Sequence, residues 1–249
     1  MEQILAVSNL VKKFGGLVAV SNIDMTVNKG EIVGLIGANG AGKTTIFNMI
    51  SGSFHPTSGK ILLEGKEVQN LPAHKMCNLG IGRTYQIVQP FADLSVLENT
   101  MVGALVRDAD VNRARTKSKE ILKFLGMEKR MHVLGRDLNL PELKRMEVAR
   151  ALATQPKILL LDEVMAGLNP SDSAMVIELV RKINESGVTI ILIEHVMKAV
   201  MSLSDRLYVL NQGKLISSGL PEEVSKDPEV IKSYLGEKSR KNPPQKQEE

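Results

Sequence analysis

The segment "GANGAGKT" at residues 37–44 carries the residue types that a phosphate-binding loop requires. It fits the pattern G-x-x-x-x-G-K-[ST] and lies between a short apolar run and a helix-like stretch. Its glycines let the backbone wrap so that N–H groups point at phosphate oxygens. Lys43 brings a cation to the β- and γ-phosphates, and Thr44 offers a hydroxyl to Mg²⁺. The expected nucleotide-binding positions are Gly37, Ala38, Asn39, Gly40, Ala41, Gly42, Lys43, Thr44 and Thr45.

A second segment, "ILLLDE" at residues 158–163, is an apolar run that ends in two carboxylates. Asp162 at a strand end can hold Mg²⁺, and Glu163 can take a proton from an attacking water or orient it. Strands often end in acids, so this segment alone is weak evidence. Beside a phosphate loop it indicates phosphoryl transfer from ATP with Mg²⁺ as the cofactor.

The composition fits a globular protein of one domain, or of a core and a small subdomain. The chain has 249 residues, of which 43% are hydrophobic and 24% charged. The net charge is +4, but the basic residues are scattered and only 3% of residues are aromatic. We therefore expect no nucleic-acid partner. The single cysteine, Cys77, excludes an internal disulfide, and the longest apolar runs are strand-sized.

Short apolar strands alternate with helical patterns along much of the chain, which favours a parallel α/β sheet covered on both faces. Strands are predicted near residues 4–14, 17–27, 30–37, 59–68, 157–163 and 188–195, with "GG" at 15–16 as a turn. Between about Leu94 and Leu152 the pattern becomes helical instead. A last helix is expected near 221–236, followed by a polar, disordered tail at 237–249.

The order of these motifs resembles the ATP-binding cassette (ABC) family over residues 3–236. Gln86 matches the glutamine of the family's Q-loop, which reports on Mg²⁺ and the γ-phosphate. His195 matches the switch histidine that contacts the γ-phosphate, and "AGLNP" at 166–170 matches the D-loop that crosses a dimer interface. Phe14 stands where the family stacks an aromatic ring on adenine, although Tyr is more common there. The resemblance assigns catalytic roles to Glu163, His195 and Gln86, and metal contacts to Thr44, Gln86 and Asp162.

The stretch "LNLPELKRMEVARAL" at 138–152 falls in the register of the family's signature helix, because Leu138 stands 24 positions before Asp162. Asn139, Leu140, Pro141 and Glu142 then replace the Ser, Gly, Gly and Gln of the signature "LSGGQ". In this family the signature of one subunit grips the γ-phosphate held by the other. Pro141 has no N–H to offer, whereas Asn139 can donate through its amide and Glu142 is tolerated. Pro141 and Glu142 also suit the first turn of a helix. We expect a well-formed helix whose start binds phosphate weakly.

The resemblance implies a P-loop NTPase (RecA-like) core with an antiparallel β subdomain and an inserted α-helical subdomain. Residues 1–236 would form a single ABC ATPase domain, with the core at 1–86 and 153–236 and the helical subdomain at about 87–152.

Further segments, including "GIGRTYQIVQPFADLSVLEN" and "IEHVMKAVMSLSDRLYVLNQGKLISSG", resemble the cassettes of branched-chain amino acid importers. Relatives of that group serve urea uptake and lipopolysaccharide export. The resemblance implies a second ABC ATPase subunit, usually a different chain, two transmembrane permeases and an extracytoplasmic substrate-binding protein. The cassette would be peripheral, on the cytoplasmic face of the plasma (inner) membrane.

Two alternatives remain at this level. One is a soluble ABC ATPase of translation or DNA repair; the single cassette and the 52 positions between Gln86 and Leu138 argue against it. The other is a weakly hydrolysing, regulatory nucleotide-binding subunit. The altered signature at Leu140 and Pro141 favours it, while the presence of Glu163 and His195 argues against it.

Overall fold

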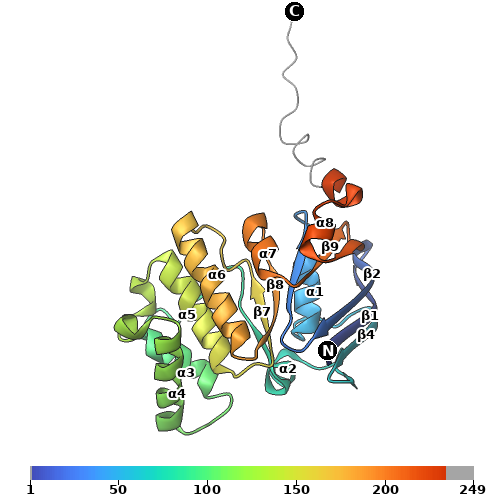
Figure 1. Ribbon diagram of the computed structural model, residues 1–249. Helices are drawn as coiled ribbons and strands as arrows, with labels where there is room; N and C mark the ends of the chain where they lie inside the picture. The colour runs from blue at the N-terminus through green and yellow to red at the C-terminus, as the bar shows by residue number, and fades with distance from the viewer. Residues whose placement is uncertain (1, 234–249) are drawn as a thin grey trace, which may run out of the picture.

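The computed structural model describes residues 2–233 and shows two sheets and the helices that pack on them (Figure 1). One sheet is antiparallel, in the order β2-β1-β4-β5, and the other has six strands in the order β10-β9-β3-β8-β7-β6. This arrangement confirms the predicted α/β class with a separate antiparallel sheet. The strands are β1 Gln3–Phe14, β2 Leu17–Asn28, β3 Ile32–Gly37, β4 Ser58–Leu63, β5 Lys66–Glu67, β6 Ile81–Arg83, β7 Ile158–Asp162, β8 Thr189–Ile193, β9 Arg206–Asn211 and β10 Lys214–Gly219.

The centre of the six-stranded sheet is parallel and completely buried. Every residue of β3, β7 and β8 is buried, which explains why these strands are continuous apolar runs rather than alternating ones. β8 pairs in parallel with both β3 and β7, and β7 pairs in parallel with β6. The carboxyl ends of these four strands therefore meet at one edge of the sheet, where ligands bind in open α/β folds.

Helices cover both faces of this sheet. Helix α1 lies between the two sheets and buries Ile46, Phe47 and Ile50 in a cluster shared with Leu5 and Ile61 of the antiparallel sheet. The opposite face carries a second cluster, to which the other long helices contribute. The helices are α1 Lys43–Ile50, α2 Ala73–Leu79, α3 Val96–Ala104, α4 Val111–Phe124, α5 Leu140–Ala153, α6 Pro170–Glu185, α7 Met197–Leu203 and α8 Pro221–Val224.

Helices α3, α4 and α5 form a block at the end of the molecule opposite the antiparallel sheet (Figure 1). In the chain this block lies between β6 and β7, where the sequence predicts helical structure. Helix α3 begins with a capping box formed by Ser95 and Glu98, and α4 begins at the cap residue Asp110. As expected, Ile121, Leu122 and Leu125 are buried.

Three local expectations were wrong in part. Residues 59–68 are not one strand, because Glu64 and Gly65 adopt positive φ and turn the chain between β4 and β5. The last helix is interrupted: α8 ends at Val224, and helical structure resumes at 228–233, where Asp227 accepts a hydrogen bond from the Glu229 N–H. The remainder of that helix and the expected tail at 237–249 lie outside the described residues. Helix α5 starts at Leu140, so Pro141 is its second residue and not its first.

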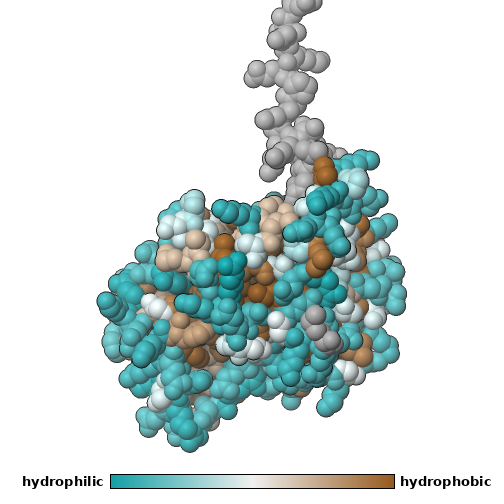
Figure 2. All heavy atoms as spheres, in the orientation of Figure 1, coloured by the Kyte–Doolittle hydropathy of each residue, from teal (hydrophilic) through white to brown (hydrophobic). Residues whose placement is uncertain are grey.

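The face of the molecule drawn in Figure 2 is largely hydrophilic, with apolar side chains gathered near its middle. Within residues 2–233, none of the helices combines the length and the apolar character that crossing a membrane requires.

Candidate nucleotide-binding site

The phosphate loop, residues 37–44, connects the carboxyl end of β3 to the start of α1. Two of its glycines are required by close contacts. Gly37 has φ 149°, and a Cβ there would lie 2.1 Å from the carbonyl oxygen of Leu210. Gly42 has φ 104°, and a Cβ there would lie 2.6 Å from the carbonyl oxygen of Ala19. Lys43 is buried and its Nζ donates to the carbonyls of Gly37 and Ala38, at 2.7 and 2.9 Å. The loop is thus wrapped around its own lysine.

A cleft of about 650 Å³ opens over this loop and brings together segments that are far apart in the sequence. Besides the loop, it is lined by Phe14 and Leu17 from the first hairpin and by Gln86 and Glu163. The predicted positions that line it are Phe14, Asn39, Gly40, Ala41, Gly42, Lys43, Thr44, Thr45, Gln86 and Glu163. Asn139 and Glu142, at the start of α5, do not line it. This is what the sequence predicts if the signature serves a nucleotide held by another subunit.

Asp162 lies at the end of β7 and forms a buried ion pair that the sequence analysis missed. Arg83, at the end of the neighbouring strand β6, donates from Nη2 to Asp162 Oδ2 across 3.0 Å. Arg83 also donates to Asn48 and Ser51, which fixes its guanidinium. Burial raises the pKa of Asp162 although the Arg83 charge opposes that rise. Asp162 Oδ1 is buried without a hydrogen-bond partner in the described part of the chain, and this carboxylate oxygen fits a hydrated Mg²⁺.

Glu163 is held at four points. Gln86 Nε2 donates to its Oε2 at 2.7 Å, and His195 Nε2 lies 2.6 Å from its Oε1. Its backbone N–H donates to Ile193 at the end of β8, and its carbonyl accepts from Lys144 Nζ at 3.1 Å. Its φ is 51°, a left-handed conformation that costs a non-glycine residue about 1–3 kcal/mol and persists only where the surroundings enforce it. All three predicted catalytic residues therefore meet at one carboxylate.

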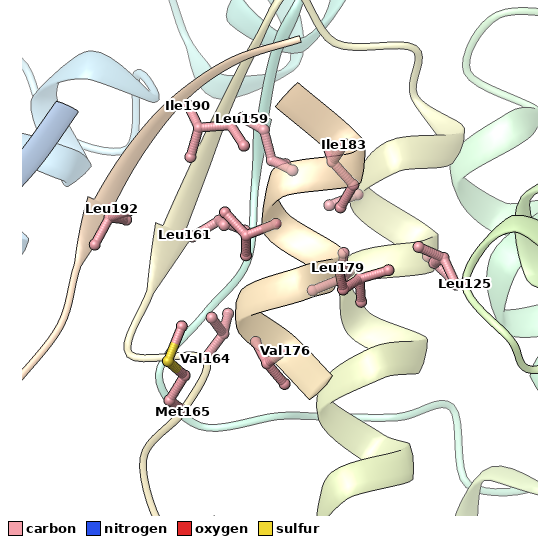
Figure 3. Packing of buried hydrophobic residues seen from close by; sticks show 14 of the residues in the cluster. Leu125, Leu159, Leu161, Val164, Met165, Val176, Leu179, Ile183, Ile190 and Leu192 are labelled. Carbon is pink, nitrogen blue, oxygen red and sulfur yellow. The ribbon is translucent and has the colours of Figure 1, made fainter. Parts of the chain in front are cut away.

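The segments that carry Glu163 and His195 are tied together by a buried glutamate. Glu194 is 3% exposed, and its Oε1 accepts a hydrogen bond from the backbone N–H of Met165 at 2.8 Å. Burial raises the pKa of Glu194 to about 7. Val164 and Met165 belong to a buried cluster with residues of β7, β8 and α6 (Figure 3). The chain after the two carboxylates is therefore anchored in the core, which limits its movement.

Phe14, the position expected to stack on adenine, ends β1 at the rim of the cleft and is 43% exposed. Its ring packs edge-to-face on Phe54 with a centroid separation of 5.6 Å. The Nζ of Lys12 lies 5.1 Å from the Phe14 centroid and 5.6 Å from that of Phe54. These contacts fix the orientation of the Phe14 ring and leave part of its surface exposed for stacking with a base.

The altered signature begins helix α5 with a complete capping box. Asn139 Oδ1 accepts from the Glu142 N–H at 3.0 Å, and Glu142 Oε2 accepts from the Asn139 N–H at 3.1 Å. Glu142 also pairs with Arg130, at 2.8 Å between Nε and Oε1. The expected well-formed helix start is confirmed, and the cap uses the oxygen of Asn139, so the cap does not engage its amide nitrogen. Leu140 is 41% exposed and lies against Gly167, where a Cβ would be 3.1 Å from its Cδ2.

Sequence reasoning missed three polar residues that hold this site, namely Arg83, Lys144 and Glu194. Glu194 had a usable signal, since it is a charged residue that follows an apolar strand and directly precedes His195. Arg83 had a weaker one, because it stands three positions before Gln86 and no strand was predicted there. Lys144 had none, because a lysine in a helix is usually solvated.

Comparison with known proteins agrees with this geometry. Residues 20–166 match the family model described as "ABC transporter", and residues 214–239 match "Branched-chain amino acid ATP-binding cassette transporter". The branched-chain amino acid transport ATP-binding protein LivG of Salmonella typhimurium is 39% identical, over 95% of this chain and 99% of its own. The corresponding protein BraF of Pseudomonas aeruginosa is 41% identical, over 94% and 98%. An ABC transporter cassette solved in its ADP conformation is 30% identical, with a TM-score of 0.87 over 95% of this chain and all of its own.

The fold and the site define a P-loop nucleoside triphosphatase, with the phosphate loop, Gln86 and Glu163 around one cleft. The chain belongs to the ABC transporter family and is an ATP-binding cassette with ATPase activity, as its motifs predict.

Proposed function

We propose that this cassette is the ATP-hydrolysing subunit of an importer for branched-chain amino acids. The relatives LivG and BraF carry that transport function in their names, and they match this chain nearly from end to end. The observation that carries the proposal is the cleft itself, where the phosphate loop faces Gln86 and Glu163. A purely regulatory cassette does not need a carboxylate held in that position.

The chain's own residues suggest how hydrolysis proceeds. Lys43 and the N–H groups of the phosphate loop hold and neutralise the β- and γ-phosphates. Glu163 accepts the proton of the attacking water, and His195 stabilises the developing charge on the γ-phosphate. Both oxygens of Glu163 already accept hydrogen bonds. Each carboxylate oxygen has two lone pairs, so Oε2 can accept from Gln86 and still accept from the attacking water.

Mg²⁺ would be held by the hydroxyl of Thr44, the amide oxygen of Gln86 and, through water, by Asp162. Thr44, Gln86 and Asp162 all line a second hollow that adjoins the nucleotide cleft. When bound there, the cation would neutralise charge on the β- and γ-phosphates. Burial raises the pKa of Asp162, and the ion pair with Arg83 opposes that rise and so favours the ionised carboxylate, which can act as an acceptor.

The cassette works as one half of a dimer in this proposal. Residues 1–236 act as a single ATPase domain in which the helical part, about 87–152, presents its signature to the nucleotide of the partner. Because Pro141 lacks an N–H and Leu140 has a side chain, the chain lends that partner a weak signature. We expect a second cassette of a different sequence, two permeases, an extracytoplasmic binding protein and a peripheral position on the cytoplasmic face of the membrane.

Two experiments test the proposal. In the complex that co-purifies with the tagged full-length chain, Glu163→Gln is expected to abolish the share of ATP hydrolysis that depends on this site. In cells lacking the chain, leucine uptake is expected to return with the wild-type gene and not with Glu163→Gln. Full ATP hydrolysis by Glu163→Gln would contradict the assigned chemistry. Uptake restored for urea but not leucine would contradict the assigned cargo.

A further inference from the structure

Lys144 is a buried cation on α5 whose contacts converge on the catalytic residues. It is 3% exposed, and its Nζ donates to the backbone carbonyls of Gln86 and Glu163, at 3.1 Å each. These two carbonyls belong to segments 77 residues apart in the chain. A single ammonium group therefore fixes the spacing between the backbone of the glutamine and that of the carboxylate.

The backbone of Glu163 needs such a contact. Its φ of 51° is strained for a residue with a side chain, and strain of this kind persists only when neighbouring groups enforce it. On one side the N–H of Glu163 is tied to Ile193. On the other side its carbonyl is tied to Lys144, so the peptide units flanking the strained residue are both fixed.

The same helix grips the Gln86 segment at a second point. Glu147 is 2% exposed and lies three residues after Lys144, on the neighbouring position of the helix face. Its Oε1 accepts a hydrogen bond from the Tyr85 N–H at 2.9 Å. With Lys144 on the carbonyl of Gln86 and Glu147 on the N–H of Tyr85, helix α5 holds this segment by one donor and one acceptor.

Charge supports the same arrangement. Burial raises the pKa of Glu147 and Glu194, and the charge of Lys144 opposes the rise at both. A neutral residue at position 144 would leave these acids without that compensation. The lysine therefore serves the site through its hydrogen bonds and through its charge.

From these contacts we infer that Lys144 is a positioning residue for ATP hydrolysis, which holds Glu163 in its strained conformation and sets its distance from Gln86. This inference rests on Glu163 being the hydrolytic carboxylate, as proposed above. Lys144 does not line the nucleotide cleft and acts through the two carbonyls. It also links the start of α5, which serves the partner's nucleotide, to the carboxylate that serves this subunit's own.

The test separates catalysis from binding in the complex that co-purifies with the full-length chain. Lys144→Met keeps the length of the side chain and removes its donors. We expect the Glu163-dependent kcat to fall roughly 10- to 100-fold, while the KM for ATP changes less than about threefold, because a misplaced base slows chemistry without loosening the phosphate loop. The matched control is Lys157→Met, which removes an exposed lysine paired with Glu64 and should leave kcat unchanged. An unchanged kcat in Lys144→Met, or a loss of ATP affinity equal to the loss of kcat, would overturn the inference.

A double-mutant cycle tests whether Lys144 acts through Glu163. In a Glu163→Gln background, Lys144→Met is expected to cause no further fall in the rate. A further fall as large as in the wild-type background would overturn the inference. If Lys144→Met does not fold, Lys144→Gln takes its place; because it keeps an amide donor, its kcat should fall by less, again with little change in the KM for ATP. If the Glu163→Gln variant still hydrolyses ATP, the proposed function is contradicted. If Glu163→Gln is inactive and Lys144→Met is fully active, only the role of Lys144 is contradicted.

Discussion

Arg83 Nη2 lies 3.0 Å from Asp162 Oδ2, and the side chains of the pair are only 6% and 1% exposed. The two residues end neighbouring parallel strands, β6 and β7, so the sheet itself brings them together. Their ion pair fixes the position of the Asp162 carboxylate beside Thr44 of the phosphate loop, where Mg²⁺ is expected.

Removing the Arg83 side chain should destabilise the fold, because it leaves the buried carboxylate of Asp162 without its counter-ion. We expect Arg83→Met to lower the free energy of unfolding by about 3–5 kcal/mol, the usual cost of breaking one side of a buried pair. Urea denaturation measures this. The matched control is Arg181→Met, whose pair with Glu178 is exposed and should contribute less than about 1 kcal/mol. Equal losses of unfolding free energy in both variants would show that the buried pair contributes no more to stability than an exposed one.

The burial of Glu194 predicts a specific dependence of stability on pH. Its pKa is raised from 4.5 to about 7, so between these values the folded protein keeps a proton that the unfolded chain releases. The contribution of Glu194 to stability therefore falls as the pH rises through this window and is constant above it. Glu194→Gln has no carboxyl group to titrate there. Its free energy of unfolding should therefore rise, relative to that of the wild type, by up to about 3 kcal/mol between about pH 5 and pH 8. Denaturation at several pH values checks this; a difference that does not change with pH would contradict it.

Phe14 should contribute to nucleotide affinity and not to catalysis. Stacking of a base on an aromatic ring contributes about 1–3 kcal/mol, so Phe14→Ala should weaken ATP binding by roughly 5- to 150-fold. Phe14→Tyr keeps the ring and should bind ATP nearly as wild type does. Phe124→Ala removes a ring of similar exposure (42%) far from the cleft and serves as the control. Equal ATP affinities of Phe14→Ala and Phe124→Ala in equilibrium binding would contradict the stacking role.

The altered signature can be tested by restoring its glycines. Leu140→Gly with Pro141→Gly gives back an N–H and removes a side chain from the surface that meets the partner's phosphate. One charge-assisted hydrogen bond is worth about 1.5–3 kcal/mol, so ATP hydrolysis by the purified chain alone should rise about tenfold or more. The control is Leu220→Gly with Pro221→Gly, the same dipeptide at the start of α8. No gain over wild type would mean that this register misplaces the signature.

Sequence patterns predicted the elements whose structure depends on residues that are close together in the chain. The phosphate loop, the buried strands β3, β7 and β8 and the well-formed start of α5 follow from glycine spacing, apolar runs and the presence of Pro141 and Glu142 in a first helical turn. The burial of helix α5 was harder to predict from the sequence, because an amphipathic pattern predicts one solvated face. In the structure it contacts α3, α4 and β6, and it buries both Lys144 and Glu147.

The sequence by itself determined that this chain binds nucleotide, since eight consecutive residues, 37–44, carry the loop, its lysine and its hydroxyl. Only the tertiary structure decided which buried charged groups hold Asp162, Glu163 and the chain that follows them. Arg83 ends β6, Lys144 lies on α5 and Glu194 directly follows β8, and their burial depends on strand order and helix packing. Charged side chains are stable there only with partners that the fold supplies from distant parts of the chain, and no local pattern encodes those partners.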